Sequence, residues 1–190
     1  MPRKYHGPED SDLFPDEGLK VLVDASNVAY ENRNLPNAKP SVENILKMRE
    51  RLEELGFCPF VIADASLRHW VDEPHRLNHL EQSGQIHQAP ADTQADYFLL
   101  SLAEHDYLPI VSNDFYRDRI DEFPLAVKEL RVPFMIADGQ VVIDQERLRR
   151  AVEVAHEHRN ENQICQHREH HHHHHGGRSR IARKSVGGSV

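Results

Sequence analysis

An aspartate comes directly after a short apolar segment near the start of the chain. Asp24 follows the run Val21-Leu22-Val23 and precedes the small residues Ala25 and Ser26. A short continuous apolar run indicates a strand that is buried on both faces. In open α/β sheets, ligands bind just beyond the carboxyl ends of the strands, so we expect Asp24 to lie at such an edge. The sequence therefore predicts that Asp24 is the first ligand of an acidic metal site.

Three later aspartates are placed to join Asp24. Asp96 shares one predicted helix face with the apolar residues of 99–103, and an inward carboxylate is costly unless it is paired or metal-bound. Asp114 follows an apolar, strand-like segment, and Asp118 stands one helical turn later, so both side chains can face one point. We therefore expect these four carboxylates to form the metal site.

The chemistry of such a cluster follows from its charge. Crowded carboxylates repel one another unless cations neutralise them. Hard oxygen ligands suit magnesium, or manganese, with waters and a substrate phosphate completing the coordination shell. Two such ions can activate a water molecule and stabilise the leaving oxygen of a phosphodiester. The residues therefore predict metal-assisted hydrolysis of a phosphodiester bond.

Several neighbours of these acids are candidates for holding a substrate. Asn27 could hydrogen-bond Asp24 or a phosphate, but asparagine is also common in turns and helix caps. Arg68 could hold a phosphate or form a surface salt bridge. An unpaired base could stack on Trp70 or Tyr116, although either ring could equally pack in the core. The candidate substrate-binding residues are Ser26, Arg33, Arg68, Ser112, Asn113 and Arg117.

Two further aspartates have structural explanations that are as good as functional ones. Asp64 ends a second apolar segment, Pro59–Ala63, so it could also reach the predicted site. Asp92 stands at the predicted start of a helix, where aspartate is favoured as an N-cap. The roles of both residues stay open at this point.

Apolar segments alternate with helical patterns along most of the chain. The predicted strands are 19–24, 59–63, 86–89, 109–112 and 133–137, and Asp138-Gly139 forms a turn into 141–143. The first predicted helix is 41–55, which Ser41 caps and Gly56 ends. The later predicted helices are 74–83, one that begins at residue 91 or 92, one that begins at about 117 and is interrupted near Pro124, and 145–156. This alternation indicates βαβ units, a parallel sheet and carboxyl strand ends on one rim.

The composition excludes several kinds of protein. No apolar run approaches 18 residues and the N-terminus has no apolar signal segment, so we expect neither a membrane partner nor secretion. Cys58 and Cys165 fit no metal or redox motif, which favours a reducing, cytoplasmic location. The formal net charge of −8 argues against nucleic-acid binding by charge alone, although a cation-binding carboxylate cluster would add negative charge.

The chain divides into three predicted parts. Residues 1–17 are polar and contain three prolines, as is typical of a flexible N-terminal arm. Residues 18–158 carry the strand and helix patterns and form the predicted domain. Residues 159–190 are rich in histidine and basic residues, including the run His170–His175, and predict a disordered tail that is either native or partly an expression tag.

Three stretches, VLVDASNVAY, ADYFLLSLA and IVSNDFYRD, resemble the NYN branch of the PIN-like ribonucleases. The likeness covers about residues 19–145 and is strongest to the Regnase-like (zinc-finger-associated) ribonuclease domain and its bacterial relatives. It implies a PIN-like three-layer α/β/α sandwich with a central, mostly parallel five-stranded sheet. It also implies magnesium-dependent endonucleolytic cleavage of RNA, expected to be single-stranded, and it is compatible with a homodimer. The matching catalytic positions are Asp24, Asn27, Asp96, Asp114 and Asp118.

The chain departs from that family pattern in two ways. The relatives carry two adjacent acids where this chain has Ala95-Asp96, and no cysteine-rich zinc finger is present. A catalytically idle PIN-like module that binds RNA or a protein is therefore an alternative. A haloacid-dehalogenase-like phosphatase is a weaker alternative, because that family needs a second aspartate where this chain has Ser26.

Overall fold

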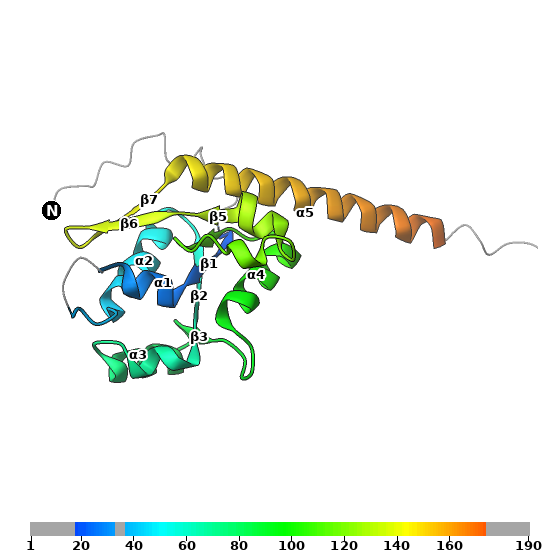
Figure 1. The fold of residues 1–190 in the computed structure, drawn as a ribbon. Helices are drawn as coiled ribbons and strands as arrows, with labels where there is room; N and C mark the ends of the chain where they lie inside the picture. The colour runs from blue at the N-terminus through cyan, green and yellow to red at the C-terminus, as the bar shows by residue number, and fades with distance from the viewer. Residues whose placement is uncertain (1–17, 33–36, 174–190) are drawn as a thin grey trace, which may run out of the picture.

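The computed structural model describes residues 18–32 and 37–173, so the predicted arm at residues 1–17 lies outside the described residues. Its centre is a five-stranded sheet in the order β3-β2-β1-β4-β5, and every neighbouring pair of strands is parallel (Figure 1). The strands are β1 (Lys20–Asp24), β2 (Cys58–Ala63), β3 (His87–Gln88), β4 (Ile110–Val111) and β5 (Arg131–Val132). The predicted α/β fold with a five-stranded parallel sheet is confirmed.

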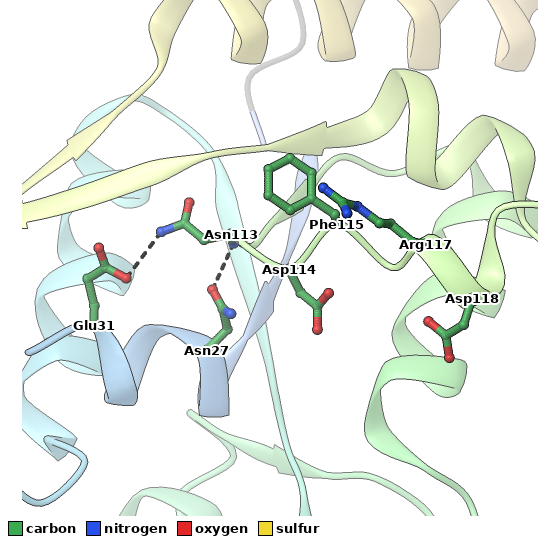
Figure 2. A pocket seen from close by; sticks show the side chains of 7 residues that line it. All are labelled: Asn27, Glu31, Asn113, Asp114, Phe115, Arg117 and Asp118. Atoms are coloured by element: carbon green, nitrogen blue, oxygen red, sulfur yellow. Dashed lines mark hydrogen bonds between the residues drawn. The ribbon is translucent and has the colours of Figure 1, made fainter. Parts of the chain in front are cut away.

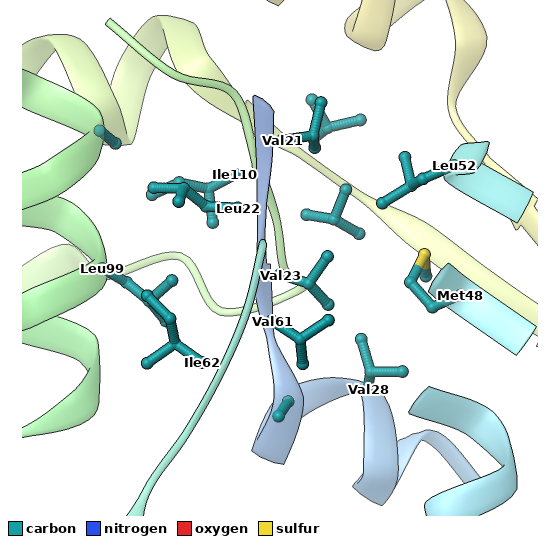
Figure 3. Close-up of a cluster of buried hydrophobic side chains, with 14 of the residues drawn as sticks. Val21, Leu22, Val23, Val28, Met48, Leu52, Val61, Ile62, Leu99 and Ile110 are labelled. Atoms are coloured by element: carbon teal, nitrogen blue, oxygen red, sulfur yellow. The ribbon is translucent and has the colours of Figure 1, made fainter. Parts of the chain in front are cut away.

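The central strands are apolar on both faces because helices cover both faces. Successive side chains of a strand point to opposite sides of the sheet. Figure 3 shows Val21, Val23 and Val61 pointing toward α2 (Val42–Glu54). Leu22, Ile62 and Ile110 point the other way, toward Leu99 of α4 (Ala95–Asp106). All of these side chains are buried, which explains the continuous apolar run before Asp24.

The helix signals in the sequence mostly correspond to real helices. Ser41 caps α2 as predicted, with its Oγ accepting a hydrogen bond from the Asn44 N–H at 3.4 Å. Gly56 follows α2 with φ +89°, a conformation that favours glycine. The shorter helices are α1 (Ala25–Ala29), η1 (Tyr30–Asn32), η2 (Ala65–His69), α3 (Pro74–Gln82), η3 (Arg117–Arg119) and the π-helical η4 (Ala126–Leu130).

Several predicted boundaries are wrong. The helix expected from residue 91 or 92 begins at Ala95, because Asp92 has φ +66° in the preceding turn and Gln94 is the N-cap. The fifth parallel strand is β5, whereas Phe134–Ala137 (β6) pairs with Gln140–Ile143 (β7) in a separate antiparallel hairpin. Pro133 stands between β5 and β6 and has no N–H to continue the hydrogen-bond ladder.

The last helix, α5 (Gln145–His173), is longer than predicted. It continues past the expected end at residue 156, so 159–173 is helical where the sequence predicted a disordered tail; residues 174–190 lie outside the described part. The Arg159 side chain donates to the Tyr107 carbonyl at 3.2 Å, and the His158 ring stacks on the Tyr107 ring at 5.1 Å, which fixes the helix beyond the predicted boundary. Neither α5 nor any other helix of the described residues is long and apolar enough to cross a membrane.

Candidate active site at the carboxyl edge of the sheet

Asp24 ends β1 and is held by donors from α1 and from the segment after β4. Its Oδ1 accepts a hydrogen bond from the Asn27 N–H at 3.1 Å, which caps α1. Its Oδ2 accepts from the Tyr116 hydroxyl at 2.8 Å and from the Ser112 hydroxyl at 3.3 Å. The carboxylate is therefore fixed in orientation before any ligand binds.

The surroundings of Asp24 oppose its ionisation. Burial raises the pKa of the Asp24 carboxyl, because loss of water disfavours the charged form. The bonds from Asn27, Tyr116 and Ser112 lower this pKa, and the charge of Asp114 raises it further. Burial also raises the pKa of the Tyr116 hydroxyl well above its usual range, so this group stays protonated and can donate. A cation beside Asp24 would offset the cost of its charge.

The loop after β4 presents Asp114 to solvent in a fixed geometry. The Asp114 N–H donates to Ser112 Oγ at 3.1 Å, and Asp114 Oδ1 accepts from the Tyr116 N–H at 2.9 Å. Tyr116 is only 2% exposed and has φ +47°, a strained conformation for a bulky side chain. The buried ring and the hydroxyl bond to Asp24 keep it there. Asp24 and Asp114 are thus positioned by the same two residues.

An open cleft of about 490 Å³ lies beside these acids (Figure 2). It is lined by Asn27, Glu31, Asn113, Asp114, Phe115, Arg117 and Asp118. Five of these residues are predicted site residues, and they come from the segments after β1 and β4. Glu31 and Phe115 are not predicted by the sequence analysis. The signal for Glu31 is its position one helical turn after Asn27, which places both side chains on one side of the chain.

Two asparagines join the segments that form the cleft. Asn27 Oδ1 accepts from the Asn113 N–H at 2.7 Å. The Asn113 side chain donates to the Phe134 carbonyl at 2.9 Å and to Glu31 Oε2 at 3.2 Å. Its Oδ1 accepts from the Phe134 N–H at 3.0 Å. Asn113 therefore ties the loop to β6, a positioning role that differs from the substrate contact expected for it.

Asp96 and Asp118 face a cation that the protein itself supplies. Arg119 Nε lies 3.7 Å from Asp96 Oδ2 and 3.8 Å from Asp118 Oδ2. This Nε is buried and has no hydrogen-bond partner among the described residues. Among the side chains that the structure describes, no three histidine, cysteine, aspartate or glutamate side chains are grouped so that they could hold one metal ion. The four predicted ligands thus fall into two pairs, Asp24 with Asp114 and Asp96 with Asp118.

The first pair fits a divalent cation. The charges of Asp24 and Asp114 already act on each other, because the Asp114 charge raises the pKa of Asp24. Mg²⁺ is commonly bound through only one or two carboxylates, while waters and substrate phosphates complete its shell. Glu31 and Asp118 line the adjacent cleft and add further negative charge. The donor set therefore suits an ion that keeps most of its waters.

Other predicted substrate-binding residues lie apart from the cleft. The Arg68 side chain donates to Gln88 Oε1 at 2.9 Å and lies 3.6 Å from Glu81 Oε2, in agreement with the salt-bridge alternative. Ser26 is a partly buried residue of α1 and does not line the cleft. Arg33 lies outside the described residues. Of the two predicted arginines that the structure describes, Arg68 and Arg117, only Arg117 lines the cleft.

The structure also decides between the alternatives left open by the sequence. Asp64 caps η2 by accepting from the Ser66 N–H at 2.8 Å, and its hydrogen bonds with Ser66 lower the pKa of Asp64. Asp92 is exposed in a turn. Of the two rings considered for base stacking, Tyr116 is buried, whereas Trp70 is exposed but does not line the cleft.

Comparison with known proteins identifies a family and one protein of similar fold. A family model described as a Zc3h12a-like ribonuclease NYN domain matches residues 18–156. A search of curated proteins gives no significant match. Two structures of the nuclear protein-only RNase P 2 of Arabidopsis thaliana resemble this fold with TM-scores of 0.53 and 0.54, at 19% and 18% sequence identity. The matches cover 72% and 76% of this chain but only 32% and 33% of those proteins, so the chain spans about a third of their length.

Proposed function

We propose that this chain, which belongs to the Zc3h12a-like ribonuclease NYN domain family, is a metal-dependent endoribonuclease that hydrolyses RNA phosphodiester bonds. The observation that carries the proposal is the pair of Asp24 and Asp114 at the carboxyl edge of the sheet. Asp24 is partly buried and costly to charge, and it does not itself line the cleft, whereas Asp114 is exposed and lines it. The cofactor we propose is magnesium, with manganese as a substitute.

Each residue has a proposed task that follows from its contacts. Asp24 and Asp114 would hold the ion, which when bound polarises the phosphate and lowers the pKa of a bound water. The Tyr116 and Ser112 hydroxyls keep the Asp24 carboxylate oriented and favour its charged form. Arg117 lines the cleft and can pair with a phosphate oxygen of the substrate.

Of the remaining predicted catalytic residues, Asn27 and Asp118 line the cleft and Asp96 does not. Asn27 accepts a bond from the Asn113 backbone, so it holds the two loops at a fixed separation. Asp118 is 79% exposed at its side chain and can orient a water within the cleft. Asp96 lies across Arg119 from Asp118, and we propose that it keeps that arginine in place. We also propose a cytoplasmic location, single-stranded RNA as the substrate and a homodimeric state.

The test is cleavage of an end-labelled single-stranded RNA by the full chain, with Mg²⁺, with Mn²⁺ and with EDTA. We expect metal-dependent internal cuts that Asp24→Asn and Asp114→Asn abolish. Asp64→Asn is the matched control, because Asp64 directly follows β2 but serves as a helix cap, a role that asparagine fills equally well.

Two outcomes would contradict the proposal. Cleavage that persists in EDTA would exclude the metal mechanism. Metal binding by calorimetry without any RNA cleavage would favour the idle binding module. As the control, Asp64→Asn should retain activity; an equal loss in this variant would show that the assay reports folding and not the site.

A further inference from the structure

Phe115 is an exposed aromatic ring in the cleft. Phe115 lies between Asp114 and Tyr116 in sequence and is 58% exposed, although burial of a phenylalanine normally stabilises the folded state. Figure 2 shows the ring at the border of the cleft, near Asp114 and Arg117. The fold thus leaves a large apolar surface open beside the proposed catalytic pair.

The backbone around Phe115 is fixed on both sides. The residue before it, Asp114, donates its N–H to Ser112 Oγ, and the residue after it, Tyr116, donates its N–H to Asp114 Oδ1. The Tyr116 ring is buried, so the chain must direct the Phe115 ring outward. A ring held in this way loses little conformational freedom when a ligand packs on it.

Two guanidinium groups accompany the ring. The Arg117 guanidinium lies 5.2 Å and the Arg131 guanidinium 4.7 Å from the centre of the Phe115 ring, both within cation–π range. Arg131 is also anchored, because its Nη1 donates to the Ser112 carbonyl at 3.1 Å. Arg117 lines the cleft and Arg131 does not, so aromatic surface and positive charge occur together beside a cleft whose other charged lining residues are acids.

We propose that Phe115, with Arg117 and Arg131, binds one unpaired nucleotide next to the cleaved phosphate, with the base stacked on the ring and a flanking phosphate near the guanidinium groups. Base stacking on aromatic side chains is a common mode of single-strand binding. Bases of a duplex already stack on each other, so only an unpaired base is free to do this. The inference rests on the proposed nuclease function, since RNA is taken as the ligand.

The charge of the chain makes such a contact important. With a formal net charge of −8, the protein gains little from general attraction to phosphates. Stacking does not depend on net charge, and it tolerates any base sequence. With one or two phosphates contacted by the arginines, log affinity should fall with log salt concentration at a slope of only about −0.7 to −1.4.

The experiment uses the full chain and a short single-stranded RNA that carries one 2-aminopurine, whose fluorescence falls when it stacks. Binding is measured in EDTA to prevent cleavage, for the unchanged protein, Phe115→Leu and Phe115→Tyr. Trp70→Leu is the matched control, since Trp70 is 61% exposed but lies outside the cleft lining. We expect quenching with the unchanged protein, roughly 5- to 140-fold weaker binding by Phe115→Leu, and near-normal binding by Phe115→Tyr and Trp70→Leu. Unaltered melting temperatures would show that the variants fold.

The outcomes separate this inference from the proposed function. Normal binding and quenching by Phe115→Leu, or a loss of binding only in Trp70→Leu, would overturn the inference, and so would the absence of any RNA binding. If the unchanged protein cuts RNA with Mg²⁺ while Phe115→Leu binds and cuts normally, the nuclease proposal stands and the stacking proposal fails. Quenching that depends on Phe115 without any cleavage would support base stacking on Phe115 and contradict the nuclease proposal.

Discussion

The Tyr116 hydroxyl is the group whose removal tests the site most directly. It donates to the Asp24 carboxylate at 2.8 Å, and both its burial and its raised pKa keep it protonated. A net hydrogen bond to a charged group contributes about 1.5–3 kcal/mol to stability. We place this bond at the lower end, about 1.5–2 kcal/mol, because it is slightly longer than typical hydroxyl–carboxylate bonds and two other donors remain on Asp24.

Tyr116→Phe should therefore lower the melting temperature by roughly 3–8 °C at neutral pH, since 1 kcal/mol corresponds to about 2–4 °C for a chain of this length. The pH dependence has a definite sign. The hydroxyl bond lowers the pKa of Asp24, so its deletion raises that pKa further. The stabilisation by the hydroxyl is present above the pKa of Asp24 and diminishes as pH falls through it, because the neutral acid is a weaker acceptor.

The assay is thermal unfolding of the metal-free chain from neutral to mildly acidic pH. Tyr97→Phe is the control, because the Tyr97 hydroxyl makes no hydrogen bond within the described ranges. A loss in Tyr116→Phe that is equally large at every pH would refute the reasoning and assign the effect to packing. A loss no larger than that of Tyr97→Phe would show that the bond contributes nothing.

Three further variants test separate contacts. Asp24→Asn should raise the metal-free melting temperature at neutral pH, because burial raises the pKa of this acid; the penalty is present above that pKa and disappears as pH falls toward the ordinary value of 3.8. A lower melting temperature at neutral pH would contradict this. Arg119→Met removes the cation that pairs with Asp96, Asp118 and Glu122, so unfolding experiments should show a loss of up to about 1 kcal/mol that shrinks in high salt. A salt-independent loss would assign the effect to packing. Asn113→Ala leaves the Phe134 N–H and carbonyl without these partners and should cost roughly 1–3 kcal/mol in urea unfolding. A cost below about 0.5 kcal/mol would mean that water replaces the side chain.

Local patterns in the sequence predict much of the fold. The apolar run before Asp24 indicates a strand covered on both faces, and Ser41 and Gly56 mark the ends of α2. The family and the fold class inferred from three short motifs are confirmed. These features can be read from the sequence because burial on two faces, capping and tight turns each depend on a few neighbouring residues.

The boundaries that were wrong depend on distant contacts. The fifth strand is β5 and not residues 133–137, because pairing with β4 selects the residues before Pro133. The last helix continues past its expected end, where Arg159 meets the Tyr107 carbonyl. These contacts cannot be inferred from the helix and strand preferences of neighbouring residues.

The same division applies to the candidate site. The sequence by itself determined which acids stand at strand ends and that a cation is needed if they meet. Only the tertiary structure decided that Asp24 and Asp114 form one pair, that Asp118 faces Arg119, and that Phe115 is the exposed ring of the cleft. The physical reason is that side-chain charge and burial depend on residues from other strands and loops, and these residues come together only when the sheet forms.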